Sequence, residues 1–292
     1  MTLHERLSAA RQRLEGAGIA PVEAAIDVEL YARTILGWDR ARILTNLQAP
    51  ASALLEPRFS EWLERRERHE PSAYIVGLRE FWGLDFRVTP AVLIPRPETE
   101  LVVEEALQLI RQEARKRPAS RDGGHVRLAD IGTGSGCIAI SIAHERHDCS
   151  IIATDVSDEA LAIARQNAVR HRVDGQVKFI ATSYLDGVDE TFDLITANPP
   201  YVREGDKRGL SQVVLHEPDV ALFGGADGLR HIDGVLDTAV AKVRPGGWFV
   251  MEFGFGQEDD VRELAGKRPA LRVDHLRADL QGLARTAIIQ RI

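Results

Sequence analysis

The chain has 292 residues, of which 44% are hydrophobic and 28% charged, and it carries a net charge of −7 at pH 7. The length suits two domains, or one large domain with an extension. The acidic balance argues against a protein that coats nucleic acid, and two cysteines, Cys137 and Cys149, are too few for a disulfide framework. No apolar run has membrane-spanning length, and residues 1–18 do not resemble a signal peptide, so we expect a cytoplasmic protein with no membrane partner.

Residues 1–75 are predicted to form a small helical bundle. Apolar residues recur at helical spacing in two segments, which end near Gly16 and at Gly37. A third helix is expected over 54–66, and no strand pattern interrupts the region. We therefore expect a separate N-terminal helical domain.

Residues 76–97 are predicted to form a β-hairpin linker, because the stretch is rich in β-branched and aromatic residues and is interrupted by Gly83. A helix is expected to follow, with the hydroxyl of Thr99 as its N-terminal cap. Residues 111–125 are expected to form an exposed connector to the next region.

Residues 98–292 are predicted to form an α/β domain with a mostly parallel sheet, because strand and helix patterns alternate. Helices are expected over 137–145 and 158–171, and Pro245-Gly246-Gly247 is expected to be the turn before the fifth strand. The final strand suits an antiparallel position. The predicted strands cover 126–131, 150–155, 176–181, 192–197, 248–253 and 284–292.

A glycine-rich loop, in the sequence ADIGTGSGC, follows the first predicted strand. Glycines there allow backbone angles closed to other residues and let a ligand approach the main chain, at the edge of the sheet where ligands bind. The dinucleotide fingerprint requires a further glycine where Cys137 stands, so the loop favours a nucleoside cofactor without a pyrophosphate over NAD. The candidate residues are Asp130, Gly132, Thr133, Gly134, Ser135 and Gly136.

Asp155 ends the second predicted strand. A carboxylate in this position can accept hydrogen bonds from both hydroxyls of a ribose. NAD and S-adenosylmethionine both carry such a ribose, so Asp155 indicates a nucleoside ligand without distinguishing the two.

The sequence Asn198-Pro199-Pro200-Tyr201 follows the fourth predicted strand. Two prolines exclude a helix or an inner strand, so a rigid turn is the plain interpretation. With the glycine loop and the acid after the second strand, however, the sequence resembles class I S-adenosylmethionine-dependent methyltransferases that act on planar amino groups. In such a site the side-chain oxygen of Asn198 and the carbonyl of Pro199 can accept the N–H bonds of the substrate nitrogen, and Tyr201 can stack on the flat substrate group.

Two longer stretches resemble one family, the HemK-type protein-glutamine methyltransferases, which modify the Gly-Gly-Gln motif of peptide chain release factors. The stretches are REFWGLDFRVTPAVLIPRPETE at 79–100 and HEPDVALFGGADGL at 216–229, and the resemblance covers nearly the whole chain. It implies a Rossmann-like sheet of seven strands, S-adenosylmethionine as the cofactor, release factors as the protein partner, and neither a metal nor a nucleic-acid partner. The implied catalytic and substrate-binding residues are Asn198, Pro199, Pro200 and Tyr201, and the implied cofactor contacts are Asp130, Gly132, Thr133, Gly134, Ser135, Gly136, Asp155, Tyr184 and Asn198.

Two alternative substrates stay open. A related methyltransferase for a glutamine of a large-subunit ribosomal protein shares the NPPY sequence, and an adenine-N6 nucleic-acid methyltransferase would use the same kind of turn together with a basic groove and a base-flipping pocket. One position departs from the family. Ser183 stands before Tyr184 where relatives carry an acid, so an acid that could meet the adenine amine is absent.

Several other features have less specific interpretations. His144, His147 and Cys149 lack a recognised ligand spacing, so no metal site is expected. Arg96 is expected to pair with a substrate backbone or with Glu98. The glycine loop at 224–228 is expected to lie near the site or to be an ordinary surface turn. The helical domain is expected to recognise the body of the release factor.

Overall fold

The computed structural model describes residues 1–116 and 125–292, and this part of the chain separates into two compact units. The helical unit comprises Met1–Leu78 and Ser211–His216, and the sheet unit comprises Arg79–Leu210 and Glu217–Ile292. Of the predicted connector 111–125, the first six residues belong to a helix, and 117–124 lie outside the described residues. No helix within the described ranges has the length and apolar character needed to cross a membrane.

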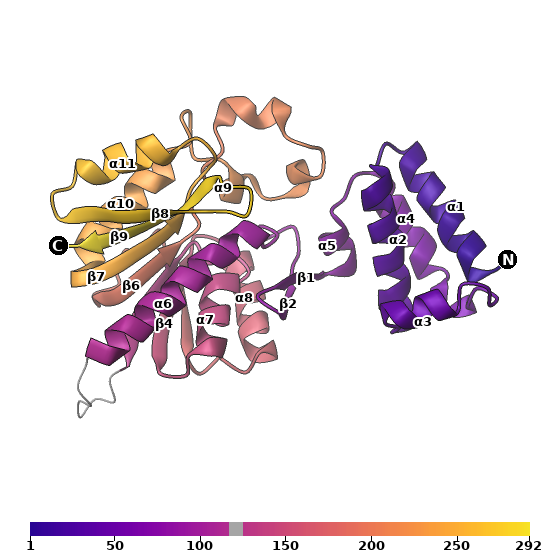
Figure 1. Ribbon diagram of the computed structural model, residues 1–292, viewed down its shortest axis with the longest axis horizontal. Helices are drawn as coiled ribbons and strands as arrows, with labels where there is room; N and C mark the ends of the chain where they lie inside the picture. The colour runs from indigo at the N-terminus through magenta and orange to yellow at the C-terminus, as the bar shows by residue number, and fades with distance from the viewer. Residues whose placement is uncertain (117–124) are drawn as a thin grey trace. The chain divides into compact units, whose positions relative to one another are not determined.

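The helical unit packs its helices around one apolar core (Figure 1). Its elements are α1 Leu3–Gly16, α2 Pro21–Leu36, α3 Arg40–Thr45, η1 Ala53–Leu55, α4 Arg58–Glu67, α5 Ser72–Val76 and η4 Val214–His216. Thr2 and Glu5 form a capping box at the start of α1, and Gly37 ends α2 in the left-handed conformation. The predicted helix over 54–66 is in fact the 3-10 turn η1 followed by α4, and α3 was not predicted.

The predicted hairpin occupies a smaller part of the chain than expected. Only β1 Leu78–Phe81 and β2 Leu84–Arg87 form strands, joined in a two-stranded sheet. The turn between them places Trp82 and Gly83 at positive φ, which glycine adopts without strain. Both Phe81 and Phe86 are buried and meet edge to face, so this hairpin belongs to the core of the sheet unit.

The sheet unit is built on seven strands in the order β5-β4-β3-β6-β7-β9-β8. The first five strands in this order run parallel to one another. The strand β9 pairs antiparallel with β7, and β8 pairs antiparallel with β9. The prediction of a mostly parallel, Rossmann-like sheet of seven strands is confirmed. The strands are β3 Val126–Ile131, β4 Cys149–Asp155, β5 Val177–Ala181, β6 Phe192–Ala197, β7 Val243–Glu252, β8 Leu271–Ala278 and β9 Ala284–Arg291.

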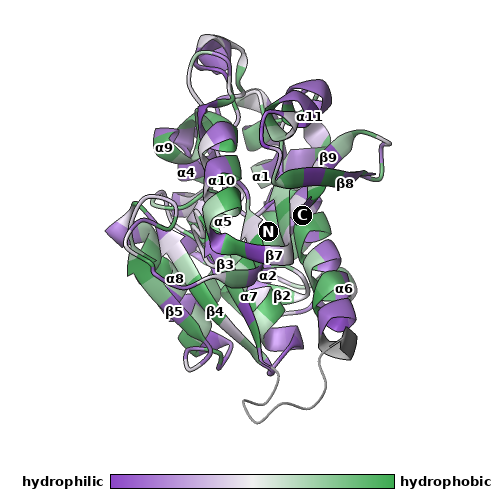
Figure 2. Ribbon diagram, turned by 90° about the vertical axis from the view of Figure 1, so that its left-hand side faces the viewer, coloured by the Kyte–Doolittle hydropathy of each residue, from purple (hydrophilic) through white to green (hydrophobic). Residues whose placement is uncertain are grey.

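Helices cover both faces of this sheet (Figure 1). They are α6 Glu100–Lys116, α7 Cys137–Glu145, α8 Asp158–Arg170, α10 Arg230–Lys242 and α11 Glu258–Gly266, with the short elements η2 Pro97–Thr99, η3 Glu204–Gly209 and α9 Asp219–Leu222. Alternate strand residues face opposite sides, so Leu128 packs with α6 and α7 while Ala129 packs with α10 and α11. Burial on both faces explains the continuous apolar runs, as the hydrophobic colouring of β4 in Figure 2 shows.

The structure differs from the sequence predictions at three places in this unit. The expected turn at Pro245-Gly246-Gly247 lies inside β7, which begins at Val243. A side chain at Gly247 would come within 2.8 Å of the carbonyl oxygen of Asp193, so the strand requires glycine there. The second difference is that α10, α11 and β8 have no counterpart among the predicted elements.

The third difference concerns Thr99, which does not cap α6 as predicted. Its hydroxyl donates instead to Glu252 Oε2 at 2.6 Å, across 153 positions of sequence. Thr99 is buried and ends η2, immediately before the first residue of α6. This contact ties the start of α6 to the end of β7.

Asn167 of α8 joins the hairpin to the glycine loop. Its side chain is fully buried, with Oδ1 accepting from the backbone N–H of Arg87 at 2.7 Å. Its Nδ2 donates to the carbonyl oxygens of Arg87 and Ser135, at 3.1 and 2.8 Å. One amide therefore satisfies three backbone groups on two segments.

Asn167→Leu is expected to destabilise the sheet unit by about 1–3 kcal/mol, because it leaves the buried carbonyl of Ser135 and two part-buried groups of Arg87 without this partner. Urea unfolding followed by circular dichroism measures the change. Gln166→Leu is the control, since Gln166 lies on the same helix with an exposed side chain. An equal effect of both substitutions would contradict the role given to Asn167.

Candidate functional site

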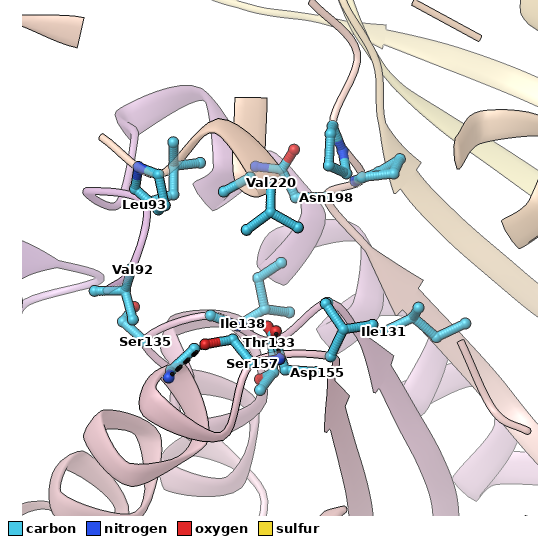
Figure 3. Close-up of a pocket in the computed structure, with 18 of the residues that line it drawn as sticks. Val92, Leu93, Ile131, Thr133, Ser135, Ile138, Asp155, Ser157, Asn198 and Val220 are labelled. Atoms are coloured by element: carbon cyan, nitrogen blue, oxygen red, sulfur yellow. Dashed lines mark hydrogen bonds between the residues drawn. The ribbon is translucent and has the colours of Figure 1, made fainter. Parts of the chain in front are cut away.

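A cavity opens in the sheet unit at the carboxyl ends of β3, β4, β5 and β6, where ligands bind in doubly wound folds (Figure 3). Its wall also includes residues of the segments 91–96 and 218–221 and of α10. Among the predicted site residues, those that line it are Gly132, Thr133, Gly134, Ser135, Asp155, Tyr184, Asn198, Pro199 and Pro200. The remaining three, Asp130, Gly136 and Tyr201, lie behind this wall.

The three loop glycines have two different roles. All adopt positive φ, at 69°, 55° and 84° for Gly132, Gly134 and Gly136. A side chain on Gly132 or Gly134 would meet nothing within 4 Å, so their backbone borders open space. A side chain on Gly136 would come within 2.6 Å of Ile140, so that glycine allows the packing at the start of α7.

Asp130 holds the glycine loop from behind. Its fully buried carboxylate accepts the hydroxyl of Thr133 at 2.7 Å and that of Thr196 at 2.8 Å. Burial raises the pKa of Asp130 to about 6, against the lowering effect of these hydrogen bonds. The carboxylate thus links the loop after β3 to the neighbouring strand β6.

Asp155 presents its carboxylate at the cavity wall. Oδ2 accepts from the backbone N–H of Gly134 and Oδ1 from that of Ser157, both at 2.9 Å. Burial raises the pKa of Asp155, and the backbone hydrogen bonds oppose that change. Each carboxylate oxygen can accept a further hydrogen bond, so the side chain suits the ribose hydroxyls of a nucleoside.

Tyr184 forms one side of the cavity together with a residue that the sequence did not indicate. Its hydroxyl lies 3.2 Å from Nδ1 of His231, which comes from α10 and also lines the cavity. Tyr184 packs so closely on Gly234 that a side chain there would come within 2.4 Å of the phenol oxygen. Burial lowers the pKa of His231, which favours the neutral ring.

The NPPY turn divides between the cavity and the protein interior. Nδ2 of Asn198 donates to the hydroxyl of Thr99 at 3.1 Å, and Asn198, Pro199 and Pro200 line the cavity. Tyr201 instead donates its phenol hydrogen to Glu252 Oε1 at 3.0 Å, and burial beside that carboxylate raises the pKa of the phenol. Tyr201 therefore lies in a position to support the turn, and its predicted stacking on a substrate stays a prediction.

Thr99 and Glu252 are site residues that the sequence reasoning missed. No local pattern joins Thr99 to a strand end 153 residues away. Glu252 did carry a usable signal. It directly follows the apolar run 248–251 at the carboxyl end of β7, a place similar to those of Asp130 and Asp155 near the ends of β3 and β4.

The glycine loop at 224–228 packs against the NPPY turn. Gly224 donates its N–H to the carbonyl of Val202 at 2.8 Å, and a side chain on Gly224 would come within 2.6 Å of the carbonyl oxygen of Pro200. A side chain on Gly228 would come within 2.4 Å of the carbonyl oxygen of Tyr201. Of the two expectations for this loop, a place near the site is the one that the structure supports.

Arg96 pairs with Glu217, which is neither of the partners expected from the sequence. The Glu217 carboxylate is buried, and it also accepts the backbone N–H of Ile94 at 3.1 Å. This pair fixes the segment 91–96 beside the segment that begins at Pro218, and both segments line the cavity.

The chemical character of the cavity fits an adenosyl cofactor. Apolar side chains form much of its wall, and the carboxylate of Asp155 and the open backbone at Gly132 and Gly134 supply polar contacts. Ser135 also lines the cavity, and its side chain is buried beside that of Cys137. Residues 1–116 and 125–292 contain no group of three or more His, Cys, Asp or Glu side chains that could hold a metal ion.

Comparisons with known proteins agree with this organisation. Residues 5–77 match the family described as PrmC N-terminal domain, and residues 116–225 match the methyltransferase small domain family. The chain is 37% identical over 291 residues to the release factor glutamine methyltransferase of Koribacter versatilis, covering 99% of this chain and 98% of that protein. It is 40% identical over 273 residues to the protein of the same name from Bradyrhizobium diazoefficiens, covering 91% and 89%.

A solved structure is similar at the level of fold. The hMettl16 catalytic domain, crystallised with the MAT2A 3'UTR hairpin 6, superposes with a TM-score of 0.57 over 78% of this chain and 82% of its own. The sequence identity is 16%, so this likeness concerns the fold alone.

Asp155→Ala is expected to weaken S-adenosylmethionine binding about ten- to hundred-fold, because two ribose hydroxyls lose a charged acceptor worth roughly 1.5–3 kcal/mol. Isothermal titration calorimetry measures the dissociation constant. Asp174→Ala is the control, since Asp174 is exposed in the turn after α8. Unchanged affinity in a folded Asp155→Ala protein would mean that the ribose lies elsewhere.

Proposed function

This chain belongs to the release factor glutamine methyltransferase family, and from that premise we propose that it methylates the side-chain amide nitrogen of the glutamine in the Gly-Gly-Gln motif of a peptide chain release factor. It is an S-adenosylmethionine-dependent protein-glutamine methyltransferase. The observation that carries the proposal is Asn198, whose Nδ2 is held by Thr99 beside a cavity that suits an adenosyl cofactor.

The chemistry of an amide explains the need for such a residue. The lone pair of a carboxamide nitrogen is delocalised, so the nitrogen is a poor nucleophile unless its N–H bonds are held out of the attacking direction. Asn198 can accept one N–H bond through Oδ1 and Pro199 the other through its carbonyl. The prolines have no N–H donor that could compete for these acceptors, and their rings restrict the backbone of the turn.

S-adenosylmethionine, when bound, supplies a methyl group on a sulfonium that is a good leaving group. With the cofactor bound, the amide nitrogen would form the new N–C bond as the C–S bond broke, and the nitrogen would then release one proton to water. No strong base is needed for this order of events. The chain's own residues would orient the nitrogen through Asn198 and Pro199 and hold the cofactor through Asp155 and the glycine loop.

Asn198→Ala is expected to lower kcat on saturating release factor about 10²–10³-fold, because it removes one oriented polar contact with the reacting nitrogen. The affinity for S-adenosylmethionine should stay within a few-fold, since Asp155 and the glycine loop remain. Gln281→Ala, which removes an exposed amide from a turn, is the control. A variant that keeps more than a tenth of the wild-type rate would contradict this role of Asn198.

Substrate choice is tested by offering tritiated S-adenosylmethionine with a release factor, a large-subunit ribosomal protein or DNA. The proposal predicts label in the release factor well above the other two. Label mainly in the ribosomal protein or in DNA would identify the corresponding alternative.

The helical unit is proposed to recognise the body of the release factor, while the cavity binds the release factor's loop that carries the Gly-Gly-Gln motif. Two observations support this division. All residues assigned to methyl transfer belong to the sheet unit, and residues 5–77 match a domain family of their own. Binding energy from contacts remote from the glutamine would then raise turnover.

A short Gly-Gly-Gln peptide is therefore expected to be methylated with a much lower kcat/KM than the intact release factor, because it lacks those remote contacts. Deleting residues 1–75 should reduce kcat/KM on the intact factor far more than on the peptide. Thermal melting and cofactor binding establish first that the shortened protein is folded. Equal losses on both substrates would mean that the helices support the sheet unit and do not select the substrate.

A further inference from the structure

A buried chain of hydrogen bonds lies directly behind the NPPY turn. Nδ2 of Asn198 donates to Oγ1 of Thr99 at 3.1 Å, and that hydroxyl donates to Oε2 of Glu252 at 2.6 Å. Oε1 of Glu252 accepts the phenol hydrogen of Tyr201 at 3.0 Å. The chain thus begins and ends on the NPPY turn and passes through residues of η2 and β7.

The direction of these bonds follows from the donors and acceptors present. Thr99 and Tyr201 both donate to Glu252, which is the arrangement of an ionised carboxylate, whose oxygens only accept. A threonine hydroxyl has one hydrogen, and Thr99 therefore can only accept from its remaining partner. The only donor of the Asn198 side chain is Nδ2, so that atom faces Thr99, and Oδ1 takes the opposite place on the amide plane.

The oxygen of Asn198 is left available by this arrangement. Oδ1 makes no hydrogen bond within the described residues, although Asn198 lines the cavity. If the amide were reversed, Nδ2 would offer hydrogens to a substrate nitrogen that itself carries hydrogens. The reaction requires a hydrogen-bond acceptor at that position. The Glu252 carboxylate, acting through Thr99, places the acceptor Oδ1 there and keeps the donor Nδ2 away.

A carboxylate in this position is not explained by stability alone. Glu252 and Thr99 are each 2% exposed, and burial raises the pKa of Glu252 while the bonds from Thr99 and Tyr201 lower it. Removing a carboxylate from water is costly unless its oxygens are hydrogen-bonded, and here two hydroxyls fill that role. The benefit that we infer for this cost is the selection of one orientation for the groups bonded to it.

We propose that Thr99 and Glu252 are positioning residues that set the orientation of the Asn198 amide, so that its oxygen faces the nitrogen to be methylated. The inference rests on the proposed function for its effect on rate. The hydrogen-bond direction itself can be measured without any substrate.

The kinetic test compares Thr99→Val, which removes the hydroxyl at nearly constant volume, with Thr99→Ser, which keeps it. Thr99→Val should lower kcat on the methyl-accepting protein about 10–100-fold, with KM changing less than about three-fold, because an interaction made mainly in the transition state is lost. Thr99→Ser should restore most of the rate. Cofactor affinity should stay within a few-fold in both.

Thr286→Val is the matched control. Thr286 is fully buried and pairs in register with Glu252 on β9, and its hydroxyl has no hydrogen-bond partner in the part of the chain that the structure describes. The same substitution there should leave kcat unchanged. Equal losses from Thr99→Val and Thr286→Val would overturn the proposal, since both would then reflect general damage to the core.

A double-mutant cycle tests whether Thr99 acts through Asn198. In an Asn198→Ala background, Thr99→Val should change kcat by less than about two-fold, because residues that act as one unit are strongly non-additive. Full additivity of the two losses would contradict the proposal. Glu252→Gln should lower kcat as Thr99→Val does. The glutamine amide can donate to Thr99, whose hydroxyl can then donate to Asn198 and permit the reversed orientation of the Asn198 amide. A wild-type kcat in this variant would also contradict the proposal.

A measurement independent of turnover separates this proposal from the proposed function. In the cofactor-bound protein, one side-chain amide hydrogen of Asn198 should exchange slowly in nuclear magnetic resonance spectra and lose that protection in Thr99→Val but not in Thr286→Val. If the wild-type protein failed to methylate a release factor, the proposed function would be refuted. The exchange measurement would still decide whether Thr99 and Glu252 orient the Asn198 amide. If the Asn198 side-chain hydrogens exchanged equally fast in all three proteins, the proposed orienting role of Thr99 and Glu252 would be overturned, whatever the substrate.

Discussion

The reactive end of this cavity depends on a single buried carboxylate, that of Glu252. A carboxylate removed from water must have its oxygens satisfied, and here two hydroxyls, from Thr99 and Tyr201, do so. Those hydroxyls belong to segments that precede α6 and follow β6, so satisfying Glu252 brings both segments to the end of β7. Because a carboxylate only accepts, the arrangement also fixes which way each hydroxyl hydrogen points.

The cofactor end of the cavity follows the same principle. Asp130 at the end of β3 is fully buried and accepts two threonine hydroxyls, one from the glycine loop and one from β6. Asp155 at the end of β4 accepts two backbone amides and keeps its carboxylate at the cavity wall. Acids at the ends of parallel strands therefore fix the loops before any ligand binds, and preorganised polar groups are the main source of catalytic stabilisation.

Much of the parallel sheet could be predicted because its strands are buried on both faces and read as short apolar runs between turn residues. The strand β3, the helix α7 and the strand β6 have the boundaries that the sequence predicted. The edge strand β8 was harder to recognise, because its alternation of apolar and polar residues breaks at Asp274 and His275, where the register of its pairing shifts. Gly234 interrupts the helical pattern of α10, and α11 has only nine residues, which is short for a clear helical repeat.

The same distinction holds for the site. Glycines and prolines mark the loops that follow the strands in the sequence. Site residues could therefore be predicted from the sequence alone, and those that line the cavity include Gly132, Gly134, Asp155 and Asn198. Thr99 and His231 could not, because each reaches the site only through long-range packing. Tyr201 was chosen for its place in a motif, yet its hydroxyl is bonded to Glu252.

The most direct test of the central claim is the position of the transferred methyl group. After reaction with deuterated S-adenosylmethionine, tandem mass spectrometry of the release factor peptide that contains Gly-Gly-Gln locates the added mass on a single side chain. The account predicts one methyl group on the side-chain nitrogen of that glutamine. A methyl group on any other residue of the factor, or none in the presence of a folded and cofactor-bound enzyme, would contradict it.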